Sequence, residues 1–160
     1  MNVEIRIKSK KSFDDLCSEV PKKVSEAGFG VLSEIKTSDV LKSKGYEYAP
    51  LRTFEICNPE YASKILNTDI RFESMLPCRI VIKGTKEGSE VIGLLPEAMA
   101  GLVGNKDADE TMLKVQELVK KIVENIAEEI NFISTLKIFC EPLLCHQEIP
   151  FYEINSSTHT

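Results

Sequence analysis

Two cysteines beside prolines have the residue types and spacing best suited to chemistry in this chain. Cys57 precedes an Asn-Pro pair, and Cys78 follows a Leu-Pro pair. The Asn-Pro pair predicts the start of a helix, whose positive end lowers the pKa of a nearby thiol and favours its nucleophilic thiolate form. The first hypothesis is therefore a thiol site. Because free cysteine is among the most buried residue types, the alternative is two small apolar side chains in the core.

Strand alternation bears on whether the two cysteines act together. Cys78 shares the apolar face of its predicted strand with Ile80 and Ile82. On the preceding predicted strand Ile56 takes the apolar face, which places Cys57 on the opposite side. A bulge would reverse this assignment, since one extra residue flips the face.

The residues around Cys57 also predict an anion site. Asn58 can accept hydrogen bonds from the free amides of a helix start. Pro59 costs no hydrogen bond at the first helical position, because the N–H that it lacks would have no partner within the helix. The same amides could bind a phosphate or carboxylate instead. Arg52 precedes this turn and could contribute a guanidinium to an anionic ligand, the alternative being a solvated surface arginine.

Methionines complete the candidate site. Met75, Met99 and Met112 could line a cavity for a small molecule, although methionines also fill gaps in protein cores. The candidate ligand-binding residues are Arg52, Cys57, Asn58, Pro59, Cys78 and Met99.

The C-terminal part of the chain carries the remaining groups that could bind a metal. Cys140, Cys145, His146 and His159 offer thiolate and imidazole, the usual zinc ligands. Their spacing misses the patterns of structural zinc sites, because Cys145 and His146 are adjacent. The sequence therefore assigns no metal, and Cys140, Cys145 and His146 are kept only as candidates.

Length, net charge and cysteine content limit the classes of function that this chain can have. The chain has 160 residues, which suits one domain, and a net charge of -5, which argues against a nucleic-acid partner. It contains no apolar run of the ~20 residues needed to cross a bilayer. We expect a cytoplasmic protein with reduced thiols and no cofactor, since its five cysteines fit poorly with a complete disulfide framework.

Periodicity predicts the elements that position these residues. Alternation predicts strands over 3–8, 29–35, 46–57, 78–83 and 90–95, and helical spacing predicts helices over 13–27, 37–44, 59–67 and 96–103. Pro21 predicts a kink or a restart in the first helix. Apolar residues recur at helical spacing from Met112 to Ile130 in a long last helix, with Asp107 as its predicted cap.

These elements predict an α+β fold, with a curved, mainly antiparallel sheet packed against the long helix. We expect one domain over residues 1–131 and a C-terminal extension over 132–160. Two apolar runs in the extension, 136–139 and 149–154, predict added strands that could pair with a sheet edge and favour a dimer.

The order and spacing of several short segments resemble a known family. The chain is similar to the domain of unknown function 302 family from about Val3 to Ile130, about four fifths of its length. The segments that carry the resemblance are Ser12-Phe13-Asp14, Gly28-Phe29-Gly30-Val31-Leu32, Arg52 with Cys57-Asn58-Pro59, Leu76-Pro77-Cys78 and Pro96-Glu97-Ala98-Met99. The resemblance implies a compact α+β fold that often forms a dimer, and it implies no activity.

Two functions are consistent with these residues. Both histidines fall after residue 145, so the predicted main domain has no histidine base. This favours a non-enzymatic module that binds a small ligand or a partner and acts as a homodimer. The alternative is a thiol-dependent enzyme or redox protein that uses Cys57, with a lysine or carboxylate as its base.

Overall fold

The computed structural model describes residues 3–128, whose centre is a five-stranded antiparallel sheet. The strands lie in the order β1-β5-β4-β3-β2, so β1 and β2 form the edges. The predicted α+β class with an antiparallel sheet is confirmed. The strands are β1 (Glu4–Ser9), β2 (Gly30–Ile35), β3 (Leu51–Cys57), β4 (Cys78–Thr85) and β5 (Gly88–Leu94).

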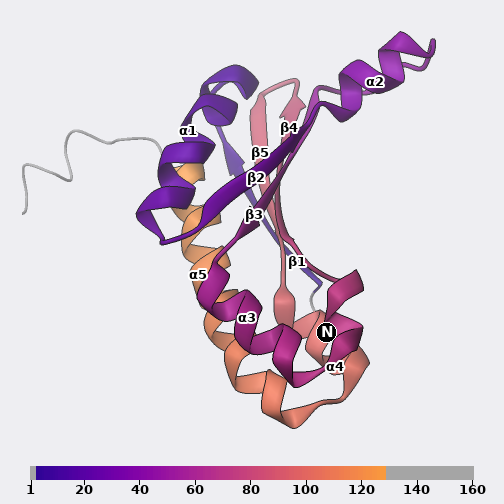
Figure 1. Cartoon of the computed structure of the whole chain (residues 1–160). Coiled ribbons are helices and arrows are strands. Elements are labelled where there is room, and N and C mark those ends of the chain that lie inside the picture. Colours follow the sequence, from indigo (N-terminus) through magenta and orange to yellow (C-terminus); the bar gives the residue numbers. More distant parts are fainter. Residues whose placement is uncertain (1–2, 129–160) are drawn as a thin grey trace, which may run out of the picture. The chain divides into compact units, whose positions relative to one another are not determined.

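Two helices, α1 and α5, pack against the sheet, and α3 and α4 lie toward one end of it (Figure 1). No helix among residues 3–128 is long and apolar enough to span a membrane. The helices are α1 (Phe13–Glu26), α2 (Thr37–Ser43), α3 (Pro59–Thr68), the 3-10 helix η1 (Ile70–Ser74), α4 (Pro96–Val103) and α5 (Lys106–Ala127).

The main core lies between the sheet and these two helices. Alternate residues of the central strands, such as Ile80 and Ile82, are fully buried in a cluster to which both α1 and α5 contribute side chains. The helix approaches β5 so closely that a Cβ at Gly93 would lie 2.8 Å from Cγ2 of Val123. Glycine at this position therefore sets how tightly the helix packs on the sheet.

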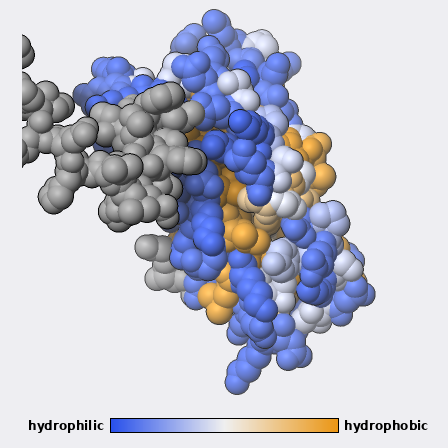
Figure 2. Space-filling view, turned by 90° about the vertical axis from the view of Figure 1, so that its left-hand side faces the viewer, coloured by the Kyte–Doolittle hydropathy of each residue, from blue (hydrophilic) through white to orange (hydrophobic). Residues whose placement is uncertain are grey.

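A second core cluster lies beyond the main one. It joins α3, η1, α4 and the first part of α5, and its largest fully buried side chain is Phe72. Seen from the side on which α1, α5 and α3 lie, hydrophilic residues form most of the visible surface and hydrophobic residues occupy a band between them (Figure 2). Most of the buried apolar side chains of residues 3–128 thus lie in two clusters.

The helix starts follow the capping chemistry of the sequence in two cases and depart from it in one. The backbone amide of Asp15 donates to the hydroxyl of Ser12, as predicted for α1. Asn58 caps α3, as also predicted. The predicted cap Asp107 is wrong: α5 begins earlier, and the amide of Asp107 donates to the side chain of Asn105.

Of the two outcomes predicted at Pro21, a kink or a restart, the restart does not occur, since α1 is one continuous helix from Phe13 to Glu26. Leu16, Val20 and Val24 are buried on the sheet, whereas Pro21 faces solvent. Water can satisfy the carbonyl group that the proline leaves without a partner, so packing of the opposite face maintains the helix.

Most element boundaries agree with the sequence prediction to within two residues, and the larger differences are two boundaries and one missed helix. The third strand begins at Leu51 rather than at residue 46, the β4–β5 loop shortens to residues 86–87, and the 3-10 helix η1 was not predicted. The predicted extension, 132–160, lies outside the described residues. Its predicted strands and the boundary at residue 131 stay predictions.

Candidate functional site

The register of β3 and β4 brings the two cysteines to one end of the sheet. These strands are antiparallel neighbours, as predicted, and Ile56 is the Cα partner of Cys78. Cys57 follows Ile56 directly and ends its strand. Simple alternation puts Cys57 on the face opposite Ile56, but both thiol residues line one pocket because the chain turns into α3 at this point.

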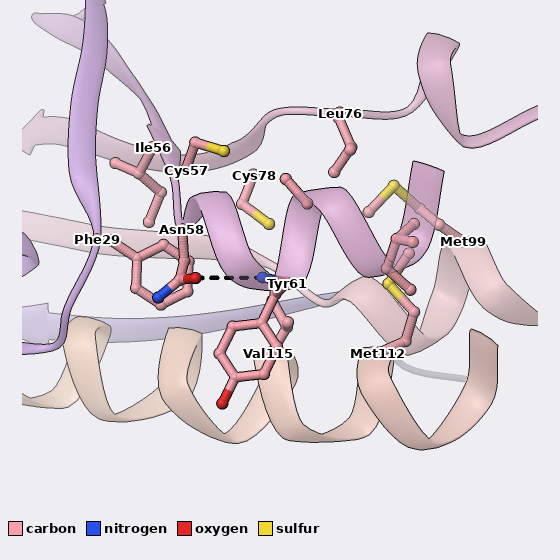
Figure 3. A pocket seen from close by; sticks show the side chains of 12 residues that line it. Phe29, Ile56, Cys57, Asn58, Tyr61, Leu76, Cys78, Met99, Met112 and Val115 are labelled. Atoms are coloured by element: carbon pink, nitrogen blue, oxygen red, sulfur yellow. Dashed lines mark hydrogen bonds between the residues drawn. The ribbon is translucent and has the colours of Figure 1, made fainter. Parts of the chain in front are cut away.

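The pocket lies where the two core clusters meet, and it is almost entirely apolar. Its cavity volume is about 20 Å³, which is roughly the room needed for one water molecule. Figure 3 shows ten of the lining side chains labelled. The lining residues are Phe29, Ile56, Cys57, Asn58, Tyr61, Ala62, Ile65, Leu76, Cys78, Met99, Met112 and Val115.

Asn58 is the main polar side chain of this lining, and its hydrogen-bonding groups are already engaged. Its Oδ1 accepts from the backbone amides of Glu60 at 3.0 Å and Tyr61 at 3.2 Å. Its Nδ2 donates to the carbonyl oxygen of Gly28 at 2.9 Å. The helix amides that could have held an anion are thus capped from within the chain, and Pro59 is exposed outside the pocket.

Both pocket thiols are held in the protonated form. The pKa of Cys78 is raised to about 11, chiefly by burial and also by the nearby Cys57, while Arg79 acts in the opposite direction. Burial also raises the pKa of Cys57. The helix start does not reverse this effect, since Asn58 occupies the amides of the first turn. The pocket therefore presents two neutral thiols near neutral pH.

The sulfur atoms of the pocket come from four separate segments. Cys57 ends β3, Cys78 begins β4, Met99 lies in α4 and Met112 in α5. The thiols lie on the strand side of the pocket and the two thioethers on the side of α4 and α5 (Figure 3). Met75, the third methionine considered, packs against the second core cluster instead.

Arg52, a candidate ligand-binding residue with a solvated surface arginine as the alternative, lies away from the pocket, and its side chain is packed and ion-paired, so the solvated alternative is wrong. Its side chain is 21% exposed, and its Nη1 lies 3.0 Å from a carboxylate oxygen of Glu34. The guanidinium carbon stands 5.4 Å from the centre of the Phe13 ring. A second carboxylate, on Asp39, lies 3.9 Å from Nη2. Arg52 thus joins β3 to α1, β2 and α2, and it does not line the pocket.

Sequence reasoning missed three important lining residues. Phe29, Tyr61 and Val115 come from different parts of the chain, and only Val115 carried a signal, as part of the apolar stripe of the long helix. Within residues 3–128, no group of three or more His, Cys, Asp or Glu side chains could hold a metal. Cys140, Cys145 and His146 lie outside the described residues.

Comparisons with known proteins agree with the fold. Residues 5–126 match the model of a family described as "Domain of unknown function DUF302". An uncharacterized protein of Aquifex aeolicus (strain VF5) is 29% identical over 96 residues, covering 57% of this chain and 67% of that protein. The crystal structure of an uncharacterized conserved DUF302 protein from Bacillus stearothermophilus has a TM-score of 0.75 at 18% identity. It covers 80% of this chain and 100% of its own.

Proposed function

The chain belongs to the DUF302 family, a family without an established activity. We propose that it is a non-enzymatic module that binds one small ligand in its pocket. We also propose that it acts as a homodimer. The observation that carries the ligand proposal is a small cavity, lined by four sulfur-containing side chains, in the part of the core where two clusters meet. Its volume restricts the ligand to a single ion or atom, or to a molecule of two or three atoms.

The chemistry of the lining supports binding over catalysis. Its two thiols have raised pKa values. A nucleophilic thiol requires a base or a lowered pKa. The lining contains no histidine, lysine or carboxylate. These features disfavour the alternative, a thiol-dependent enzyme using Cys57. Alkylation of the native protein by iodoacetamide at pH 7 tests this, and labelling of Cys57 faster than a model thiol would favour the enzyme.

Binding itself can be tested with xenon, a small apolar probe. In a ¹H–¹³C spectrum of protein labelled at the methionine methyl groups, xenon should shift the signals of Met99 and Met112. The signal of Met75, which lies outside the lining, provides the internal control. If all three signals stay fixed or move equally, the pocket does not bind a small apolar atom selectively.

A projecting segment supports the homodimer. Residues 36–50, here called the arm, connect β2 to β3 and contain helix α2, and none of them is buried. Figure 1 shows α2 standing away from the sheet. Val40, Tyr46 and Tyr48 are each more than half exposed. A seven-residue helix is marginal without packing, so contact with another molecule would stabilise it.

A second copy of the chain suits this arm for two reasons. The arm carries both signs of charge, with Asp39 and Glu47 near Lys42 and Lys44, so a two-fold interface can pair opposite charges. It also continues from β2, an edge strand of the sheet. A β-bulge at Leu32 interrupts the pairing pattern of that edge, which favours contact through side chains over a continued sheet.

Sedimentation equilibrium of the full chain tests this interface. We expect a dimer, and we expect the double substitution Tyr46→Ser and Tyr48→Ser to raise its dissociation constant at least tenfold. Ile70→Ser is the matched control, because Ile70 is an exposed apolar residue in η1, away from the arm. A wild-type monomer, or equal weakening by the control, would reject the arm as the interface.

A further inference from the structure

The sulfur atoms of the pocket point to the chemical class of its ligand. Two thiols and two thioethers line a single cavity, and three of the four residues are at most 8% exposed. Cys57 is only half-buried and stands at the rim. The charge on Cys57 affects the pKa of Cys78, so the two thiols lie within electrostatic range of each other.

The size of the cavity excludes most organic ligands. A volume of about 20 Å³ accommodates one water-sized body, whereas pockets for organic ligands usually measure several hundred Å³. A water molecule needs two to four polar partners, yet the lining is almost entirely apolar and Asn58, its main polar side chain, already accepts two hydrogen bonds and donates one. A single ion that prefers sulfur over oxygen satisfies both the size and the lining.

Thiolate and thioether ligands together select copper(I) among the biological metals. Zinc and other divalent ions are a poorer match, because within residues 3–128 no histidine or carboxylate joins the cysteines in a group of three. The rim position of Cys57 gives a route for an incoming ion. Methionine is flexible, so Met99 and Met112 can adjust toward a bound metal.

From this arrangement we propose that the pocket is a binding site for one soft monovalent metal ion, copper(I), held by the sulfurs of Cys57 and Cys78 with thioether support from Met112 and Met99. Two thiols lose their protons and form two S–Cu bonds, so one Cu⁺ enters, two H⁺ leave, and the oxidation state of copper is unchanged. The bound group carries one net negative charge, which the nearby Arg79 partly balances. This assignment rests on the proposed function, because it uses the same pocket.

The test must separate the pocket from the cysteines and histidine of the C-terminal part. The full chain carrying Cys140→Ser, Cys145→Ser and His146→Ala provides the background. Anaerobic titration against a chromophoric copper(I) chelator should give one bound ion per chain, with a thiolate-to-copper charge-transfer absorption. Adding Cys57→Ser should weaken binding at least 100-fold, and Met112→Leu, which conserves volume, should weaken it about tenfold.

Cys17→Ala in the same background is the matched control, since Cys17 is a buried thiol of α1 that does not line the pocket. It should leave copper affinity unchanged. Cys57 is partly exposed at the rim, so its serine variant should retain the fold, which circular dichroism checks. Loss of copper binding in the background itself, or undiminished binding after Cys57→Ser, would overturn the assignment.

The xenon experiment distinguishes failure of the metal assignment from failure of the binding proposal. If copper(I) is not bound but xenon shifts the signals of Met99 and Met112, the metal assignment is wrong and the ligand pocket remains. If neither probe affects the pocket, both proposals are wrong.

Discussion

Replacing Asn58 should separate the two contacts by which this residue holds the pocket together. Its Oδ1 caps α3 through the amides of Glu60 and Tyr61, and its Nδ2 holds the carbonyl oxygen of Gly28 across the chain. Loss of an N-cap costs about 1 kcal/mol of stability, and loss of a neutral hydrogen bond costs about as much. We therefore expect Asn58→Ala to lower the free energy of unfolding by about 2 kcal/mol.

Asn58→Asp keeps an acceptor at the helix start but removes the donor to Gly28. Its expected cost is about 1 kcal/mol, because the carboxylate still caps α3 and gains from the helix dipole. Urea denaturation gives both values. Asn67→Ala is the control, since Asn67 is an exposed asparagine of the same helix, and its cost should stay within about 0.5 kcal/mol.

The same variants should change the environment of Cys57, the neighbour of Asn58 in the pocket. Loosening of the turn should expose this thiol, so Asn58→Ala should be alkylated faster than the wild type at pH 7. The reasoning fails if Asn58→Ala costs no more than Asn67→Ala. It also fails if the aspartate and alanine variants are equally unstable, since the cap would then contribute nothing.

Three further predictions concern the sheet, the buried thiol and the arginine. Gly93→Ala should lower the urea-derived free energy of unfolding by about 1–3 kcal/mol, because its Cβ would meet Val123. Gly30→Ala, whose Cβ would lie 4.0 Å from the carbonyl oxygen of Cys57, should cost less; equal costs would mean that the close approach of α5 to Gly93 does not matter for stability. The stabilising effect of the raised Cys78 pKa is present below 9.0, the ordinary pKa of a thiol, and is lost as pH rises toward about 11. The urea midpoint should therefore fall over this interval, and less steeply in Cys78→Ala; parallel curves would contradict this prediction. Arg52→Leu should lower the free energy of unfolding by about 1–2 kcal/mol, which corresponds to a thermal midpoint lower by several degrees, because the variant loses the ion pair with Glu34 and the contact with Phe13. An unchanged midpoint would mean that these contacts are energetically neutral.

The elements themselves were largely predictable because their signals are local. An Asn-Pro pair specifies a helix start through neighbouring amides, and the apolar stripe that includes Met112 specifies α5 through its own periodicity. The failures were local signals that packing overrode. Pro21 does not interrupt α1, because the opposite face of that helix is buried on the sheet.

The environment of Arg52 shows what local signals cannot provide. Its place on β3 follows from the local strand pattern, but its partners Glu34 and Asp39 come from other elements. Whether an arginine is solvated or packed depends on which elements lie over it. That information is absent from the residues beside it in the chain.

By itself, the sequence determined which segments form helices and strands, how α1 and α3 are capped and that the two cysteines lie near strand ends. Only the tertiary structure decided that these cysteines share a small cavity with Met99 and Met112, and that their thiols stay protonated. The physical reason is that periodicity and capping act over a few residues, whereas a cavity and its burial arise from side chains of several elements packed together.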